Sequence, residues 1–206
     1  MRIAIFGLTI SSSWGNGHAT LWRGLCKSLV ALGHEFVFFE RDVPYYANSR
    51  DWIMLPGAYG TSRLVLYSDW PAVESQAKSE LASCDTAIVS SYCFDARAAT
   101  DAILDARRPR AVFYDLDTPV TLDSLRSGKS VPYIPRHGLR HFDLVLSYTG
   151  GAALEALRAD LGARRVRALY GHVDPDVHQP VPAVDRYRAM LSRLGTYAAD
   201  RQAMLE

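Results

Sequence analysis

A glycine-rich loop followed by a histidine is the part of this chain whose residue types most directly suggest chemistry. The loop residues are Ser13, Trp14, Gly15, Asn16 and Gly17. They follow an apolar run at residues 2–8, and His18 then opens an apolar pattern of helical period that extends to residue 32. These patterns predict a strand, a loop and a helix. The free N–H groups and positive dipole end of a helix attract anions. We therefore expect the loop to line a site for an anionic ligand, with the His18 imidazole at its edge.

Three aspartates near the ends of predicted strands could assist this histidine. Asp115 ends a predicted strand, Asp117 comes two residues later, and Asp95 begins a predicted helix. A carboxylate within reach of His18 would fix its tautomer and stabilise the imidazolium, which would make the ring a general base. Aspartate also caps helices and turns, which is the favoured interpretation of Asp95 and is equally open for Asp117. All three remain candidates to face the site.

A dinucleotide site is an alternative for the glycine loop. That motif needs Gly-x-Gly-x-x-Gly directly after the first strand and an acidic residue at the end of the second. Glu40 meets the second requirement, but Thr20 stands where the third glycine belongs, and the loop between Gly7 and Gly15 is long. The pattern favours a sugar or phosphate site over a nicotinamide or flavin cofactor. A flexible loop carrying an ordinary surface histidine is the other alternative.

The histidines and cysteines predict no metal site. His137 and His141 are spaced i, i+4, but Pro135 and Gly138 argue against a rigid helix there, and no third ligand is nearby in the sequence. The cysteines are odd in number and follow no ligand or disulfide spacing, which is typical of a reducing compartment. They are Cys26, Cys84 and Cys93.

Composition limits the classes of protein that this chain can belong to. Of 206 residues, 49% are apolar and 22% are charged, as in globular proteins. The 23 basic and 22 acidic residues give a net charge of +1, which offers no electrostatic reason to bind nucleic acid. Neither a signal peptide nor an apolar stretch long enough for a transmembrane helix is evident. We expect a soluble cytoplasmic protein.

Apolar and amphipathic segments alternate along most of the chain. The expected strands cover residues 2–8, 35–40, 63–67, 86–90, 111–115, 142–147 and 166–170, and the expected helices cover 18–32, 70–83, 95–106, 120–127 and 152–161. Continuously apolar strands are buried on both faces, as in parallel sheets covered by helices. The pattern predicts an α/β fold, a doubly wound and mostly parallel Rossmann-like sheet with right-handed crossovers. Ligands in such sheets bind beyond the carboxyl ends of the strands.

The pattern changes after Pro180. Residues 181–185 resemble a linker, a strand is expected around residues 194–197, and a helix from Asp200. We therefore expect a first domain over residues 1–180, followed over 181–206 by a linker and the opening elements of an incomplete second domain.

Residues 169–180 carry a resemblance to a known family. They are similar to the Asn-Gly-Val-Asp-x-x-x-Phe-x-Pro segment that closes the first lobe of GT-B glycosyltransferases of the family 4 kind. The matching residues are Gly171, Val173, Asp174 and Pro180; the departures are Tyr170 for Asn, an inserted His172, and His178 for Phe. Taken with residues 114–119 and 147–151, essentially the whole chain resembles the N-terminal half of CgeB-like (spore-maturation-type) glycosyltransferases. A plain turn with Asp174 in an architectural role would suit the same segment.

This resemblance implies the acceptor-side lobe of an enzyme that transfers a sugar from a nucleotide-diphosphate donor to an unknown acceptor. The second lobe of the same polypeptide would bind most of the donor nucleotide, without a metal or a further cofactor. His18 would touch the reacting hydroxyl or the transferred sugar, as a base in an inverting reaction or as a positioning group in a retaining one, and Asp115 or Asp117 would hold an acceptor hydroxyl. Further substrate contacts are expected from the segment that opens the 152–161 helix: Thr149, Gly150 and Gly151.

Two other functions remain open. A sugar- or nucleotide-binding module without turnover, or a truncated homologue, would fit a chain that lacks most of a donor-binding lobe. A dinucleotide-dependent oxidoreductase is the less favoured alternative, for the reasons given above.

Overall fold

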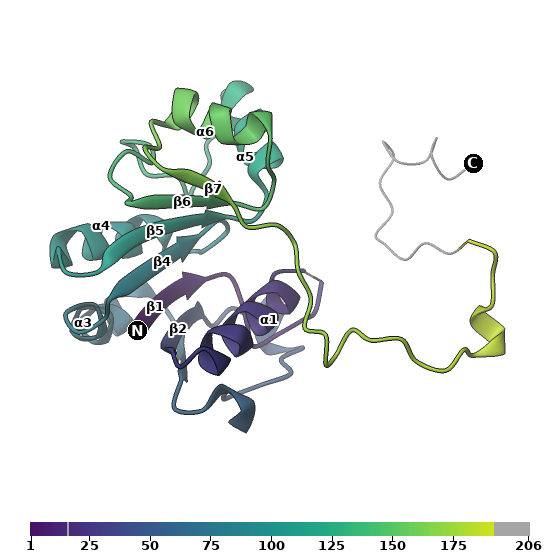
Figure 1. Cartoon of the computed structure of the whole chain (residues 1–206). Coiled ribbons are helices and arrows are strands. Elements are labelled where there is room, and N and C mark those ends of the chain that lie inside the picture. Colours follow the sequence, from purple (N-terminus) through teal and green to yellow (C-terminus); the bar gives the residue numbers. More distant parts are fainter. Residues whose placement is uncertain (16, 192–206) are drawn as a thin grey trace. The chain divides into compact units, whose positions relative to one another are not determined.

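The computed structural model describes residues 1–15 and 17–191, and it contains one open sheet of seven parallel strands (Figure 1). The strands are β1 (Arg2–Gly7), β2 (Glu35–Arg41), β3 (Arg63–Tyr67), β4 (Thr86–Ser90), β5 (Arg110–Asp115), β6 (Leu144–Ser147) and β7 (Val166–Ala168). Their order across the sheet is β3-β2-β1-β4-β5-β6-β7. The expected doubly wound, Rossmann-like α/β fold is confirmed, and every strand pair is parallel.

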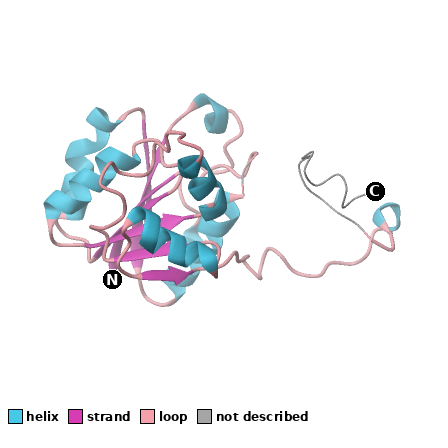
Figure 2. Cartoon of the chain, turned by 90° about the horizontal axis from the view of Figure 1, so that it is seen from above, coloured by secondary structure: helices cyan, strands magenta, loops and turns pink. Residues whose placement is uncertain are grey.

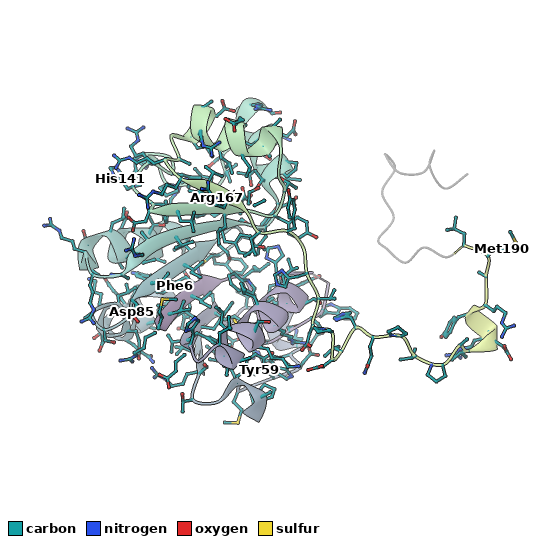
Figure 3. All side chains as sticks on the ribbon, in the orientation of Figure 1. Phe6, Tyr59, Asp85, His141, Arg167 and Met190 are labelled. Atoms are coloured by element: carbon teal, nitrogen blue, oxygen red, sulfur yellow. The ribbon has the colours of Figure 1, made fainter. Side chains whose placement is uncertain are left out.

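Helices cover both faces of the sheet, as the two views of the chain show (Figures 1 and 2). They are α1 (His18–Ala31), α2 (Pro44–Ala47), α3 (Trp70–Leu81), α4 (Ala96–Ala106), α5 (Thr118–Arg126) and α6 (Ala152–Leu161), with 3₁₀ turns at η1 (Gly57–Tyr59) and η2 (Asp185–Tyr187). Side chains of a strand alternate between its two faces. In β1, Phe6 belongs to the core under α3 and α4, whereas Ile5 belongs to the core under α1, where Trp22 packs. Phe6 lies deep inside the molecule, whereas His141 is at its surface (Figure 3).

The expected elements are present, with shifts at their ends. The last strand stops at Ala168 instead of residue 170, and the chain then leaves the sheet. The helix expected at 120 already begins at Thr118, because Pro119 suits the first turn of a helix, where a missing N–H has no consequence. The connection between β2 and β3, expected to be a loop, contains the short α2 and the 3₁₀ turn η1.

The chain divides into a compact unit, Met1–Asp174, and a second unit, Pro175–Glu206. All seven strands belong to the first unit, whereas the sequence placed the boundary near residue 180. In the second unit, residues 175–191 contain only the η2 turn as regular structure. The strand expected near residues 194–197 and the helix expected from Asp200 lie outside the described residues. Among the described helices, none has the length and apolar character needed to cross a membrane.

Candidate functional site

The strand order reverses between β1 and β4, which lie side by side at the centre of the sheet. From β1 the chain proceeds outward to β2 and β3, and from β4 it proceeds the opposite way to β5, β6 and β7. The loops that leave the carboxyl ends of two such strands separate and open a crevice, and ligands of open α/β sheets bind there. The glycine loop after β1 and the turn after β4 are the two sides of this crevice.

The first half of the glycine loop is fixed by Glu40 at the end of β2. Both Glu40 and residues 9–12 are buried. The Glu40 carboxylate accepts hydrogen bonds from Thr9 Oγ1 at 2.9 Å, from the backbone nitrogens of Ile10 and Ser11 at 2.8 and 3.0 Å, and from Ser11 Oγ at 2.5 Å. The alternative of a flexible loop is therefore wrong for this half. Glu40 uses both carboxylate oxygens inside the protein, where a dinucleotide site would offer them to a ribose.

The second half of the loop reaches the surface. Ser13 binds Asp51 Oδ2 through its backbone nitrogen at 2.9 Å and its hydroxyl at 2.8 Å. Trp14 is 61% exposed. Gly15 has φ +65°, a backbone conformation that favours glycine. Asn16, also expected to bind substrate, lies outside the described residues.

His18 is the first residue of α1, and its half-buried ring lines a cavity of about 470 Å³. The cavity is lined by Gly17, His18, Thr20, Leu21, Leu116, Asp117, Tyr148 and His172. Burial lowers the pKa of His18 to about 4, because desolvation of the imidazolium outweighs the attraction of the Asp117 carboxylate. At neutral pH the ring is therefore uncharged, and its nitrogen is less basic than that of an exposed histidine.

Asp117 and Tyr92 complete the polar group around His18. The Tyr92 hydroxyl donates a hydrogen bond to Asp117 Oδ2 at 3.1 Å, and the Tyr92 and His18 rings meet edge to face with centroids 5.4 Å apart. Asp117 occupies the N-cap position of α5, as one interpretation expected, but its side chain makes no capping hydrogen bond and is left to the cavity. Tyr92 was not among the predicted site residues; the available signal was its place two residues after β4, at the point where the strand order reverses.

Asp115, expected to touch substrate, is buried and is not among the residues that line the cavity. Its Oδ1 accepts hydrogen bonds from the Asp117 backbone nitrogen and from Thr121 Oγ1, both at 3.1 Å. Burial raises the pKa of Asp115 to about 6. These contacts correct the expectation: Asp115 shapes the turn that presents Asp117, and Asp117 is the carboxylate that reaches the cavity.

Asp95 belongs to a different part of the sheet edge. Its carboxylate pairs with Arg41 at 3.2 Å and accepts a hydrogen bond from the Tyr67 hydroxyl at 3.1 Å. Asp95 occupies the N-cap position of α4, as the favoured interpretation expected, but its side chain makes no capping hydrogen bond. It also does not line the cavity, which separates it from the predicted substrate contacts.

The segment after β6 contributes a different residue from those expected. Thr149, Gly150 and Gly151 do not line the cavity, whereas Tyr148 does. Thr149 instead bonds back to Ser147, its backbone nitrogen donating to Ser147 Oγ at 3.1 Å. The cavity wall thus takes an aromatic side chain from this segment.

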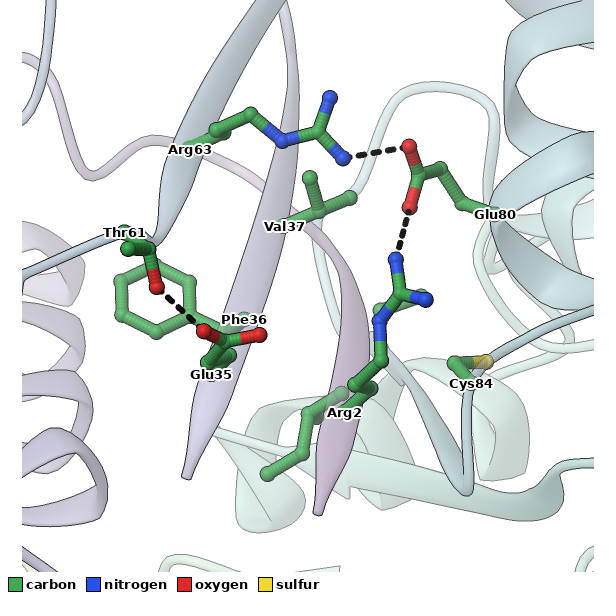
Figure 4. Close-up of a pocket in the computed structure, with 10 residues that line it drawn as sticks. Arg2, Glu35, Phe36, Val37, Thr61, Arg63, Glu80 and Cys84 are labelled. Carbon is green, nitrogen blue, oxygen red and sulfur yellow. Dashed lines mark hydrogen bonds and ion pairs between the residues drawn. The ribbon is translucent and has the colours of Figure 1, made fainter. Parts of the chain in front are cut away.

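A smaller pocket of about 50 Å³ lies at the opposite, amino-terminal end of the sheet (Figure 4). Arg2, Glu35 and Arg63 begin β1, β2 and β3 there. Glu80 of α3 pairs with both arginines, at 3.5 Å to Arg2 and 2.5 Å to Arg63, and Glu35 accepts a hydrogen bond from Thr61 (Figure 4). Because Glu80 already pairs with both arginines, this small pocket offers little to an anionic ligand.

No group of three or more metal-ligating side chains occurs among residues 1–15 and 17–191. The His137 and His141 rings are 4.7 Å apart without a third ligand.

None of the protein-family models matches this sequence, and none of the curated proteins does. The function must therefore be argued from the cavity itself.

Proposed function

We propose that this chain is the acceptor-side lobe of a GT-B glycosyltransferase, which transfers a sugar from a nucleotide-diphosphate sugar to a hydroxyl group of its acceptor. The observation that carries the proposal is that an uncharged His18 and a carboxylate, Asp117, line one cavity at the carboxyl edge of the sheet. A hydroxyl substrate needs a proton acceptor and hydrogen-bond acceptors, and this pair supplies both. Tyr148 adds the kind of aromatic surface on which a sugar ring packs.

The roles of the residues follow from the bonds that change. The acceptor oxygen forms a bond to the anomeric carbon as the bond from that carbon to the phosphate oxygen breaks, and the electron pair leaves with the nucleoside diphosphate. In an inverting reaction His18 takes the hydroxyl proton. In a retaining reaction His18 instead binds the transferred sugar and stabilises the developing charge. Asp117 binds an acceptor hydroxyl in either case, and a second lobe of the same polypeptide binds the nucleotide.

A sugar-binding module without turnover is the second candidate. The observation that favours it is that all eight residues lining the cavity belong to the unit Met1–Asp174, so a ligand could bind there without a second lobe.

The test uses the protein translated from its complete reading frame. Release of nucleoside diphosphate is measured with a panel of nucleotide sugars and hydroxylated acceptors. His18→Ala is expected to lower the rate by about 10²–10⁴-fold, and Asp117→Asn to lower it too, whereas the matched control Asp95→Asn retains it. Sugar binding without release of nucleoside diphosphate would favour the module. An unchanged rate in His18→Ala would remove this histidine from the mechanism.

A further inference from the structure

Tyr92 adopts a backbone conformation that aromatic residues rarely take. Its φ is +63°, and among the described residues only one other non-glycine residue, Arg107, has a positive φ. Arg107 ends α4 in the left-handed conformation, which is common at helix ends. Tyr92 lies in a turn after β4, where a left-handed backbone costs a non-glycine residue on the order of 1–2 kcal/mol. Strain of this kind persists only where the surroundings enforce it, and it is concentrated at functional sites.

Three contacts hold the Tyr92 side chain in place. Its hydroxyl donates to Asp117, its ring meets His18 edge to face, and its other side packs against Tyr133 with centroids 4.9 Å apart. Tyr133 is itself fixed, because its hydroxyl lies 2.9 Å from Thr121 Oγ1. The strained turn is therefore supported from the α5 side and projects its ring toward α1.

We propose that Tyr92 is a positioning residue for the site: the left-handed turn places its ring against His18, where it excludes water, and its hydroxyl on Asp117, whose orientation it fixes. The role of Tyr92 in catalysis rests on the proposed function, whereas its contacts with His18 and Asp117 are independent of that function. One side chain thus couples the two groups that the reaction would use. Asp117 also lines the cavity, where its carboxylate can meet a ligand.

The protonation of His18 reports on this role. Desolvation is the main reason why the pKa of His18 falls to about 4, and Asp117 opposes it. The other titratable groups on the cavity wall are Tyr148 and His172. Burial and neighbouring phenol and carboxyl groups raise the pKa of Tyr92 above its ordinary value, so Tyr92 stays a neutral donor. Removing the ring should admit water to His18 and favour the imidazolium.

The experiment is an NMR titration of histidine-labelled protein, in which His18→Gln assigns the His18 signal. Tyr92→Gly removes the ring and relieves the strained turn, so the pKa of His18 should move from about 4 toward its ordinary value of 6.5. Tyr67→Phe is the matched control: it removes a buried phenol hydroxyl that bonds to Asp95, away from the cavity, and should leave the titration of His18 unchanged. Tyr92→Phe keeps the ring and should keep most of the lowered pKa.

A Tyr92→Gly protein in which His18 titrates as in the wild type would overturn the proposal. If that variant does not fold, Tyr92→Asn takes its place, because asparagine tolerates the left-handed conformation. The titration needs no sugar donor, so its outcome is independent of the transfer assay. A shifted His18 in a protein that transfers no sugar would keep the positioning role and reject the proposed function.

Discussion

His172 Nε2 donates a hydrogen bond to the backbone carbonyl of Leu21, 2.9 Å away in α1. The contact joins the segment that follows β7 to the helix that begins with His18. Two further contacts lie along the same helix face, since Leu21, Gly24 and Lys27 are spaced three apart. Gly24 lets the chain approach closely, and Lys27 Nζ pairs with both carboxylate oxygens of Asp174 at 3.1 and 2.9 Å. Residues 172–174 are therefore held along α1, and Asp174 has the architectural role that one interpretation of the sequence gave it.

A larger residue at Gly24 should displace the segment after β7 from its contact with α1. A methyl group there would lie 3.3 Å from the backbone nitrogen of Asp174, so a valine must displace the chain. We expect Gly24→Val to lower the free energy of unfolding by about 1–3 kcal/mol and to speed hydrogen exchange in residues 172–174. Ser28→Val, at an exposed position of the same helix, controls for the effect of a β-branched side chain in α1. Equal losses in the two variants, with unchanged exchange, would contradict the docking.

Much of the fold could be predicted, because strands that are buried on both faces of a sheet are apolar along most of their length. The apolar runs at residues 63–67 and 86–90 are β3 and β4 to the residue, and the α6 helix over 152–161 is likewise correct. The same pattern explains why some residues of the cavity wall could be predicted: polar residues that follow apolar strands must lie at the carboxyl end of a parallel sheet.

The roles of individual polar residues could not be predicted, because they depend on contacts between distant parts of the chain. Glu40 has the position of a ribose ligand but bonds to a loop 29 or more residues away. Asp95 has the position of a helix cap but pairs with Arg41, 54 residues earlier. The turn at Tyr92 is left-handed although its residue is not glycine, so the sequence gives no sign of this conformation. Local pattern gives the position of such residues along an element, and only the folded chain gives their partners.

Asp115 and His18 should change the stability of the protein in opposite directions as pH falls. The pKa of Asp115 is raised from 3.8 to about 6, so the cost of burying its charge is relieved as pH falls from 6 to 3.8, and stability increases. The pKa of His18 is lowered from 6.5 to about 4, so stability decreases as pH falls through that window. Each effect amounts to about 3 kcal/mol at most, at 1.36 kcal/mol per pH unit. In the wild type the two largely cancel between pH 4 and 6.

Single substitutions should separate these effects in urea unfolding measured from pH 4 to 7. Asp115→Asn removes the stabilising change, so this variant should lose stability relative to the wild type as the solution is acidified. His18→Gln removes the opposing change and should gain relative stability over the same range. Other groups that titrate alike in all three proteins contribute equally to each stability, so their contributions cancel when a variant is compared with the wild type. Parallel curves for the three proteins would show that neither side chain titrates as its burial requires.

Gly171 and Tyr148 should behave as a coupled pair. A methyl group at Gly171 would overlap with the Tyr148 hydroxyl and lie 2.6 Å from the ring carbon that carries it, so Gly171→Ala must push the ring aside. Because the Tyr148 ring is partly exposed and can turn aside, we expect this variant to lose about 0.5–1.5 kcal/mol of stability, the cost of moving the ring off its rotamer. With Tyr148→Ala already present, the same substitution should have little effect, which a double-mutant cycle would record as a coupling of at least about 0.5 kcal/mol. Gly17→Ala is the control, because nothing lies within 4 Å of a methyl group at that position. Additive losses in the cycle would mean that the ring does not hold its place against Gly171, and the cavity would then lack a fixed aromatic wall.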